Sequence, residues 1–124
     1  MTEQIIDNVN QPKHYCSHPS GIECIQIAEF LPFNLGNALK YLWRSDLKWD
    51  KQEDTRKAIF YLHRQTALGK APLYTYQEVK YIKKLLDDIW WSKDSRLHKI
   101  ISDIAFGTKE DWLALADDLE GCNV

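Results

Sequence analysis

This sequence has few cysteines, a small net charge and no long hydrophobic run. The three cysteines, Cys16, Cys24 and Cys122, are an odd and scattered set that predicts no disulfide framework. No apolar run reaches membrane-spanning length, and the acidic first ten residues lack the charged-then-apolar order of a signal peptide. The net charge of −2 supplies no overall positive field for nucleic acid. We therefore expect a cytoplasmic protein that binds neither membrane nor nucleic acid.

Familiar motifs for cofactors and catalysis are absent as well. The chain has no phosphate-binding G-x-x-x-x-G-K-[ST] loop and no Rossmann glycine fingerprint. It also lacks G-x-S-x-G and H-E-x-x-H. His14, Cys16, His18 and Cys24 are close in sequence, but their spacing fits no common zinc pattern, so we expect no metal site. Any phosphate must then be bound by helical side chains and helix N-termini.

Helical periodicity is what the sequence does have. Its 124 residues are enough for one compact core, and apolar residues recur at helical spacing between capping patterns. The sequence predicts an all-α fold, a small bundle of five to six helices with an N-terminal loop packed on a helical hairpin. The expected helices cover residues 20–31, 34 to 46–49, 50–68, 75–91, 94–106 and 108–121.

Caps and helix breakers set these boundaries. Ser20 and Glu23 form a capping-box pattern for the first helix, and Thr75 opens a similar pattern for the fourth. Asn34 suits the N-cap of the second helix, and Gly69 suits the left-handed residue that ends the third. We divide the chain into a loop segment (1–19), a helical core (20–69) and a helical C-terminal extension (70–124) that packs on the core or swaps with it.

A basic stripe on the second predicted helix is the main functional feature. Asn37, Lys40, Arg44 and Lys48 follow one another at spacings of three, four and four, which places them on one helical face. The opposite side of this helix is apolar and predicts a buried face. Two lysines, an arginine and an amide suit a phosphate or another anion.

Two further elements are expected to face this stripe. A short connection makes the second and third helices antiparallel neighbours, so their polar faces can share a groove. The N-terminal loop brings histidine and aromatic side chains, and Tyr41 or Trp43 offers a surface on which a base can stack. The contributors are His14, Tyr15, His18 and Ser20 from the loop, and Asp54, Lys57, Tyr61 and Arg64 from the third helix.

Four motifs in a fixed order resemble the SaV-like family of small bacteriophage proteins. The resemblance covers residues 8–66 and leaves residues 70–124 outside it. Ser45-Asp46 departs from the small residue and glycine expected there, and Cys16 replaces a hydroxyl residue. The motifs are V-N-Q-P-K-H-Y (9–15), S-H-P-S-G-I-E-C-I (17–25), F-N-L-G-N-A-L-K-Y-L-W-R (33–44) and E-D-T-R-K-A-I-F-Y-L (53–62).

The resemblance implies a phage origin and nucleotide chemistry. The family includes a phage kinase that phosphorylates deoxynucleoside monophosphates without a P-loop. One hypothesis is therefore a nucleotide-binding protein that acts as such a kinase, with Mg²⁺ accompanying the nucleotide. Lys40 and Arg44 would hold phosphate oxygens with Lys48 at the rim, Asp54 would help to bind Mg²⁺ or orient the attacking oxygen, and His14 would contact the phosphate.

Other functions remain open at this point. The family also includes a phage protein that sensitises its host to an abortive-infection system. A second hypothesis is therefore a non-enzymatic counter-defence protein that sequesters a nucleotide-derived immune signal or binds a host defence protein. Trp90, Trp91 and Trp112 in the extension would supply a homo-oligomer interface. A third hypothesis, an all-α nucleotide pyrophosphohydrolase, needs carboxylates such as Glu23 and Glu53 to hold Mg²⁺.

Overall fold

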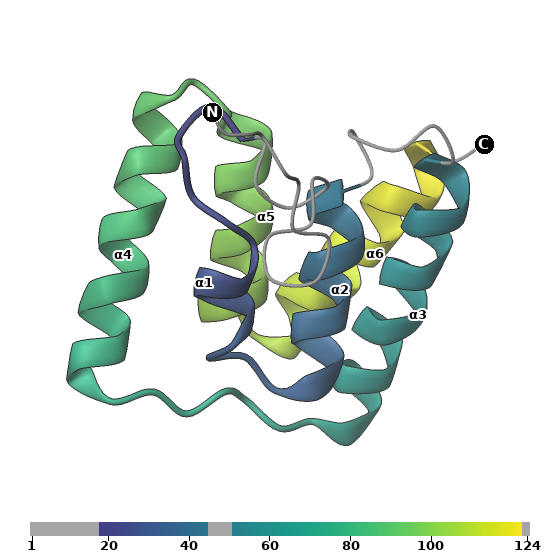
Figure 1. The fold of residues 1–124 in the computed structure, drawn as a ribbon. Coiled ribbons are helices and arrows are strands. Elements are labelled where there is room, and N and C mark those ends of the chain that lie inside the picture. Colours follow the sequence, from purple (N-terminus) through teal and green to yellow (C-terminus); the bar gives the residue numbers. More distant parts are fainter. Residues whose placement is uncertain (1–17, 45–50, 123–124) are drawn as a thin grey trace, which may run out of the picture.

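The structure, a computed structural model, describes residues 18–44 and 51–122 of the chain. Within these ranges the chain forms six helices and no strand, which confirms the all-α prediction (Figure 1). No helix in the described ranges is both long and apolar enough to cross a bilayer. The helices are α1 (Ile25–Ala28), α2 (Phe33–Arg44), α3 (Lys51–Leu68), α4 (Tyr76–Trp91), α5 (Ser95–Phe106) and α6 (Lys109–Cys122).

Helix α2 lies at the centre of this arrangement. It packs against α3 on one side and against α1 and α5 elsewhere. Figure 1 shows α2 and α3 running in opposite directions side by side, as the sequence predicts for a helical hairpin. Helix α6 packs on α3 and α5, and α4 stands at the outer edge against α5. Residues 69–75 cross the bottom of the view to connect α3 with α4.

One hydrophobic core joins all six helices. The apolar stripe of α2 packs against α3, α1 and α5, while α6 joins this core through α3 and α5 and α4 joins it through α5. Residues 70–122 therefore share a core with the described residues of the 20–69 segment. The largest fully buried apolar side chains are Ile27, Leu35, Leu39, Leu42, Leu62, Ile82, Ile89, Ile101, Ile104 and Trp112.

The first helix is much shorter than predicted. Gly21 has a φ of +79°, a left-handed conformation that a continuing right-handed helix does not allow. Ser20 therefore caps no helix; its Oγ accepts a hydrogen bond from Ile22 N at 3.2 Å within the loop. The predicted helix over residues 20–31 was wrong in its first turn, and α1 covers only Ile25–Ala28.

The start of α2 also differs from the prediction by one residue. The helix begins at Phe33, and Gly36 N donates to Pro32 O at 2.8 Å. Pro32 therefore supplies the first helical acceptor, and Asn34 lies inside the first turn rather than at the N-cap. The predicted end of this helix, at residues 46–49, lies outside the described residues.

Gly69 and Thr75 end and begin their helices as predicted, and Asp94 provides a further cap. Gly69 has a φ of +70° and ends α3. Thr75 Oγ accepts from Glu78 N at 3.1 Å, and the Glu78 carboxylate accepts from Thr75 N at 2.8 Å, which completes the capping box of α4. Asp94 caps α5 by accepting from Leu97 N at 3.0 Å. These local contacts set the boundaries of the C-terminal helices.

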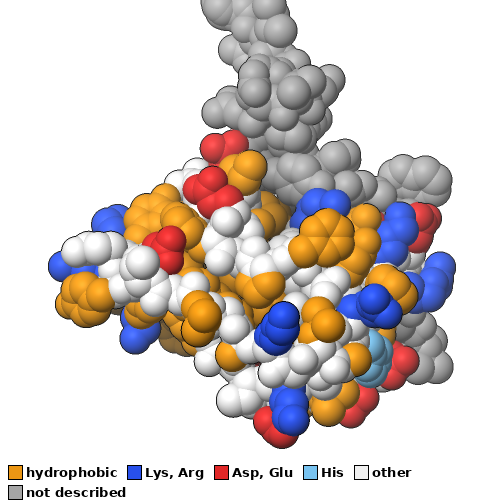
Figure 2. Space-filling view, turned by 90° about the horizontal axis from the view of Figure 1, so that it is seen from below, with side chains coloured by type: hydrophobic (Ala, Val, Ile, Leu, Met, Phe, Trp, Pro, Cys, Tyr) orange, Lys and Arg blue, Asp and Glu red, His pale blue; other side chains and the backbone are white. Residues whose placement is uncertain are grey.

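Some hydrophobic side chains are left at the surface. Seen from below in Figure 2, they emerge in several separate groups between lysines, arginines and acids rather than as one continuous face. Leu73, in the connection between α3 and α4, is 94% exposed, and Phe33 at the start of α2 is 74% exposed. Phe33 belongs to an aromatic cluster between α2 and α3.

Gly107 and Gly121 provide a matched test of how closely α5 and α6 pack where the chain passes from one to the other. A Cβ at Gly107 would lie 2.3 Å from Asp103 O and 2.8 Å from Asp111 Cβ, whereas a Cβ at Gly121 meets nothing within 4 Å. We expect Gly107→Ala to lower the free energy of unfolding by about 2 kcal/mol or more, as overpacking does. Gly121→Ala, within α6, should be neutral or stabilising by about 0.5–1 kcal/mol. Urea unfolding of both variants checks this, and equal effects would contradict the close approach of α5 and α6 at Gly107.

Candidate functional site

Two lysines from neighbouring helices converge on one tyrosine ring. Lys40 Nζ of α2 lies 4.6 Å from the centre of the Tyr41 ring, and Lys57 Nζ of α3 lies 5.3 Å from it. Both distances are within the range of about 6 Å in which a cation is attracted to an aromatic face. The sequence predicts that Lys40 and Lys57 share a groove, and the structure brings them together at Tyr41.

Tyr41 is part of an aromatic cluster, defined here as Phe33, Tyr41, Phe60 and Tyr61. Tyr41 and Tyr61 are stacked with ring centres 6.1 Å apart and planes 8° from parallel. Phe33 meets Tyr61 edge-on at 6.0 Å, and Phe60 meets it edge-on at 5.2 Å. Such geometries are favourable for aromatic pairs and hold α2 and α3 in register at this end of the hairpin.

An open hollow of about 380 Å³ lies against this cluster. We call it the α2–α3 hollow. Its charged side chains, Glu53, Arg56 and Lys57, all belong to α3. They lie on one face of this helix, because residues three and four apart on a helix are neighbours. This spacing was visible in the sequence, but only the packing of α2 on α3 shows that the face borders a hollow. The lining residues are Tyr41, Glu53, Arg56, Lys57, Phe60 and Tyr61.

The charges around the α2–α3 hollow are mixed, with an excess of cations. Lys57 Nζ is 2.8 Å from Glu53 Oε2 in a half-exposed ion pair. The hydrogen bond that Lys57 donates to Glu53 is the main reason why the pKa of Lys57 is raised above its ordinary value, so Lys57 stays protonated at neutral pH. Arg56 and Lys40 add two further cations beside one carboxylate. This arrangement can bind an anion next to an aromatic surface.

Other predicted site residues are not presented at the α2–α3 hollow. The Asn37 side chain donates to Phe33 O at 2.9 Å, within its own helix. Asp54 is fully buried, with 0% of its surface exposed, so its carboxylate does not face solvent. A catalytic role for Asp54 would require α3 to expose that side. The residues His14, Tyr15 and Lys48, and the side chain of Arg44, lie outside the described part of the chain.

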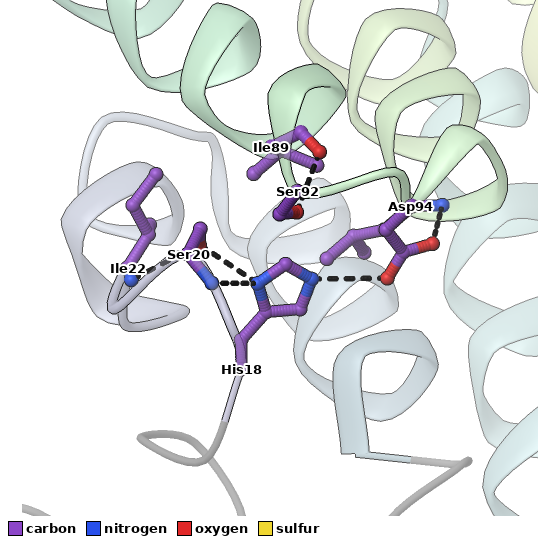
Figure 3. Close-up of polar contacts among 7 residues, drawn as sticks. His18, Ser20, Ile22, Ile89, Ser92 and Asp94 are labelled. Atoms are coloured by element: carbon purple, nitrogen blue, oxygen red, sulfur yellow. Dashed lines mark hydrogen bonds and ion pairs between the residues drawn. The ribbon is translucent and has the colours of Figure 1, made fainter.

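His18 is held elsewhere, in a hydrogen-bonded bridge between the N-terminal segment and the α4–α5 turn (Figure 3). Its Nε2 is 2.9 Å from Asp94 Oδ2, and its Nδ1 is 2.7 Å from Ser20 Oγ and 3.1 Å from Ser20 N. A backbone N–H can only donate, so Nδ1 accepts and the neutral ring carries its proton on Nε2. The ring also packs 5.8 Å from that of Trp43. We call this the His18 bridge.

The His18 bridge resembles a serine–histidine–aspartate triad in its order of contacts, but it is not built for nucleophilic attack. Ser20 Oγ accepts from Ile22 N at 3.2 Å, and Gly21 N donates to His18 O at 2.9 Å. The amides next to the hydroxyl are therefore engaged and cannot form an oxyanion hole. Trp43 and Tyr41, two residues apart on α2, point to different sides, so the bridge and the α2–α3 hollow are separate.

The contacts of the His18 bridge change the pKa of Asp94. Partial burial raises the pKa of its carboxyl, but hydrogen bonds from Leu97 N and His18, together with the nearby Arg96, outweigh burial and lower the pKa below 3.8. A carboxyl whose pKa is lowered by folding stabilises the protein in its charged form.

This lowered pKa predicts an acid-side loss of stability. The contribution of Asp94 is complete above about pH 5 and is lost as the pH falls through 3.8 and below, because the unfolded state then binds the proton more readily. Asp94→Asn keeps the ability to cap α5 but not the charge, so it should cost at most about 1 kcal/mol at pH 6, given solvent screening. The difference in unfolding free energy between the two proteins should shrink progressively as the pH falls below 3.8. Parallel curves would contradict the bridge, and Asp87→Asn, an exposed acid of α4, controls for loss of one charge.

Comparison with known proteins adds a family match without an activity. A family model described as a protein of unknown function (DUF3310) matches residues 9–63. No curated protein and no solved structure matches the chain. The matched span contains α1, α2 and most of α3, hence both helices that line the α2–α3 hollow, and it ends before α4. The resemblance to SaV-like proteins stays a prediction.

The described residues contain no cluster of three or more His, Cys, Asp and Glu side chains able to hold a metal ion. Cys24 is 3% exposed and sits in the core beneath α2. Burial raises the pKa of its thiol to about 12, although Lys40 nearby opposes the shift. This agrees with the interpretation of Cys24 as a small core residue.

Cys24 should therefore be unreactive in the folded protein. The thiolate is the reactive form, and a thiol with a pKa of about 12 is almost entirely protonated at pH 8. We expect iodoacetamide to leave Cys24 unmodified in buffer and to alkylate it fully in urea, as read from the mass of the peptide that contains it. Alkylation of Cys24 at equal rates in both conditions would contradict its burial.

Another hollow, of about 340 Å³, lies at the α4–α5 turn and is lined by Trp90, Trp91, Lys93 and Ser95. Trp90 and Trp91 are 53% and 79% exposed, while Trp112 is buried in the core. Lys93 is the single cation among its lining residues. This hollow therefore attracts an anion less strongly than the α2–α3 hollow does.

Proposed function

We propose that this protein binds a nucleotide in the α2–α3 hollow. The observation that carries the proposal is the convergence of the Lys40 and Lys57 ammonium groups on the Tyr41 ring, which is itself stacked on Tyr61. Both ammonium groups lie within 5.3 Å of the ring centre, and Glu53 is the carboxylate paired with Lys57, so the surface keeps an excess of positive charge that attracts an anion. A ligand that joins a planar base to a phosphate satisfies both parts of this surface.

The lining residues, and Lys40 beside them on the Tyr41 ring, have distinct parts in this proposal. The aromatic cluster supplies a face for the base, and stacking on such a face contributes about 1–3 kcal/mol per base. Lys40, Arg56 and Lys57 hold phosphate oxygens through charge-assisted hydrogen bonds. Glu53 keeps Lys57 in place and accepts a hydrogen bond from a sugar hydroxyl or a base amino group.

For the reaction, the resemblance favours a deoxynucleoside monophosphate kinase that works with Mg²⁺. Phosphoryl transfer depends mainly on positioning and on neutralising charge, and the cations of the hollow suit that task. If the protein is such a kinase, His14 and Lys48 are proposed to belong to the same site. Both residues come from segments that precede or follow the described helices in the sequence. A phage-encoded kinase of this kind would act in the cytoplasm of the infected host.

A second candidate is a protein that holds the nucleotide without changing it. Burial of Asp54 favours this version, because the carboxylate proposed to bind Mg²⁺ or orient the attacking oxygen is covered by protein. Such a protein would sequester a nucleotide-derived immune signal or bind a host defence protein. The exposed Trp90 and Trp91 would serve as its homo-oligomer contact.

Lysine substitutions test the binding site directly. Lys40→Ala and Lys57→Ala should each weaken nucleotide binding at least fivefold, about 1 kcal/mol, because each removes a charge-assisted hydrogen bond. Lys99→Ala is the matched control, since Lys99 is also exposed and paired four residues away, with Asp103 of α5. Calorimetry with a panel of dNMPs and ATP measures the affinities. Equal affinity in all four proteins would place the site elsewhere.

Turnover separates the two versions of the function. Purified protein is incubated with ATP, Mg²⁺ and each dNMP, and products are separated by ion-exchange chromatography. A kinase forms dNDP and ADP, whereas a sequestering protein returns the ligand intact after denaturation. Binding with no turnover of any dNMP would remove the kinase and leave the second candidate.

A further inference from the structure

A third hollow lies along α3, next to the α2–α3 hollow. It has a volume of about 470 Å³ and is lined by Arg56, Ile59, Phe60 and Glu120. We call it the α3–α6 hollow, because Glu120 comes from α6, which packs on α3. Arg56 and Phe60 line both hollows. The two spaces are therefore neighbours that share a boundary.

The shared boundary is a single turn of α3. Arg56 and Phe60 are four residues apart and lie one above the other on the helix surface, both exposed. Tyr61 and Lys57 face the α2 side of this boundary, and Ile59 faces the α6 side. Either hollow alone lies in the lower half of the range of about 300–1,000 Å³ that small-molecule sites occupy, so a ligand that crosses the boundary has room in both.

Charge differs between the two hollows. The α2–α3 hollow has the cations Arg56 and Lys57 with one acid, Glu53. The α3–α6 hollow has Arg56 as its lining cation and Glu120 as its lining acid, with the nearly buried Ile59 as an apolar wall. An anion is therefore favoured at Arg56, in the middle, and repelled at the far end by Glu120. A carboxylate there accepts hydrogen bonds from hydroxyl or amino groups.

We propose that the ligand is a nucleotide whose phosphate or diphosphate bridges to a second, uncharged group that bears hydroxyl or amino groups. The base stacks at Tyr41 and Tyr61, the bridging phosphate lies at Arg56, and the second group fills the α3–α6 hollow against Ile59 and Glu120. This inference rests on the proposed function and narrows its substrate class. A nucleoside triphosphate fits less well, because its terminal phosphates would approach Glu120.

The experiment compares ligands that differ only beyond the first phosphate. Calorimetry measures the binding of AMP, ATP, ADP-ribose and the dinucleotide ApA to the full chain, and of the matching uridine series UMP, UTP, UDP-glucose and UpU. Both series are used because stacking accepts any base. In at least one series we expect a bridged ligand to bind tenfold or more tightly than the mononucleotide or the triphosphate. Preference for the nucleotide sugar or for the dinucleotide identifies the second group.

Substitution of Glu120 tests the part of the α3–α6 hollow that is proposed to hold the second group. Glu120→Gln should weaken the preferred bridged ligand about fivefold and leave the mononucleotide unchanged, while Glu120→Lys should strengthen the triphosphate. Glu110→Gln, an exposed acid in the first turn of the same helix, is the control and should change none of the affinities.

Two results overturn the inference in distinguishable ways. Equal binding of mononucleotide and bridged ligands, unaffected by Glu120→Gln but weakened by Lys57→Ala, removes the bridged ligand and leaves the proposed nucleotide site standing. No binding of any member of either series removes the proposed function and this inference together.

Discussion

Burial of the apolar stripe of α2 is the constraint on which the rest of the structure depends. Leu35, Ala38, Leu39 and Leu42 are all fully buried, and this fixes the rotation of α2 about its own axis. Once that rotation is fixed, Tyr41 faces α3 and meets Tyr61, and Trp43 faces the opposite way and meets His18. Lys40, next to Tyr41 in the chain, then has its Nζ 4.6 Å from the centre of the Tyr41 ring. Burial of this single stripe thus determines where both the candidate site and the His18 bridge lie.

The C-terminal helices complete this arrangement. Asp94 caps α5 and also accepts the His18 Nε2–H, so the turn that starts α5 holds the segment that leads into α1. Helix α6 packs on α3 and contributes Glu120 to the surface beside Arg56. Residues outside the family match therefore shape the surroundings of a site whose main walls lie inside it.

Local sequence signals predicted what depends on local physics. The capping box of Thr75 and Glu78 and the left-handed Gly69 were readable, because each is decided within a few residues. The first helix was misjudged because Gly21 adopts a left-handed conformation that the S-G-I-E pattern does not reveal. Spacing placed Lys40, Lys57 and Tyr61 together, since they lie on facing helices of one hairpin. Spacing alone does not tell that Asp54 faces the core, nor that His18 meets an aspartate 76 residues away.

The most direct measurement of the central claim is a two-dimensional ¹H–¹⁵N NMR titration of the labelled full chain with a nucleotide. The account predicts that the amide signals that move most belong to α2 and α3 around Tyr41, Arg56, Lys57 and Tyr61, with smaller shifts elsewhere. Shifts confined to the α4–α5 turn around Trp91 and Lys93, or no shifts at millimolar nucleotide, would contradict it.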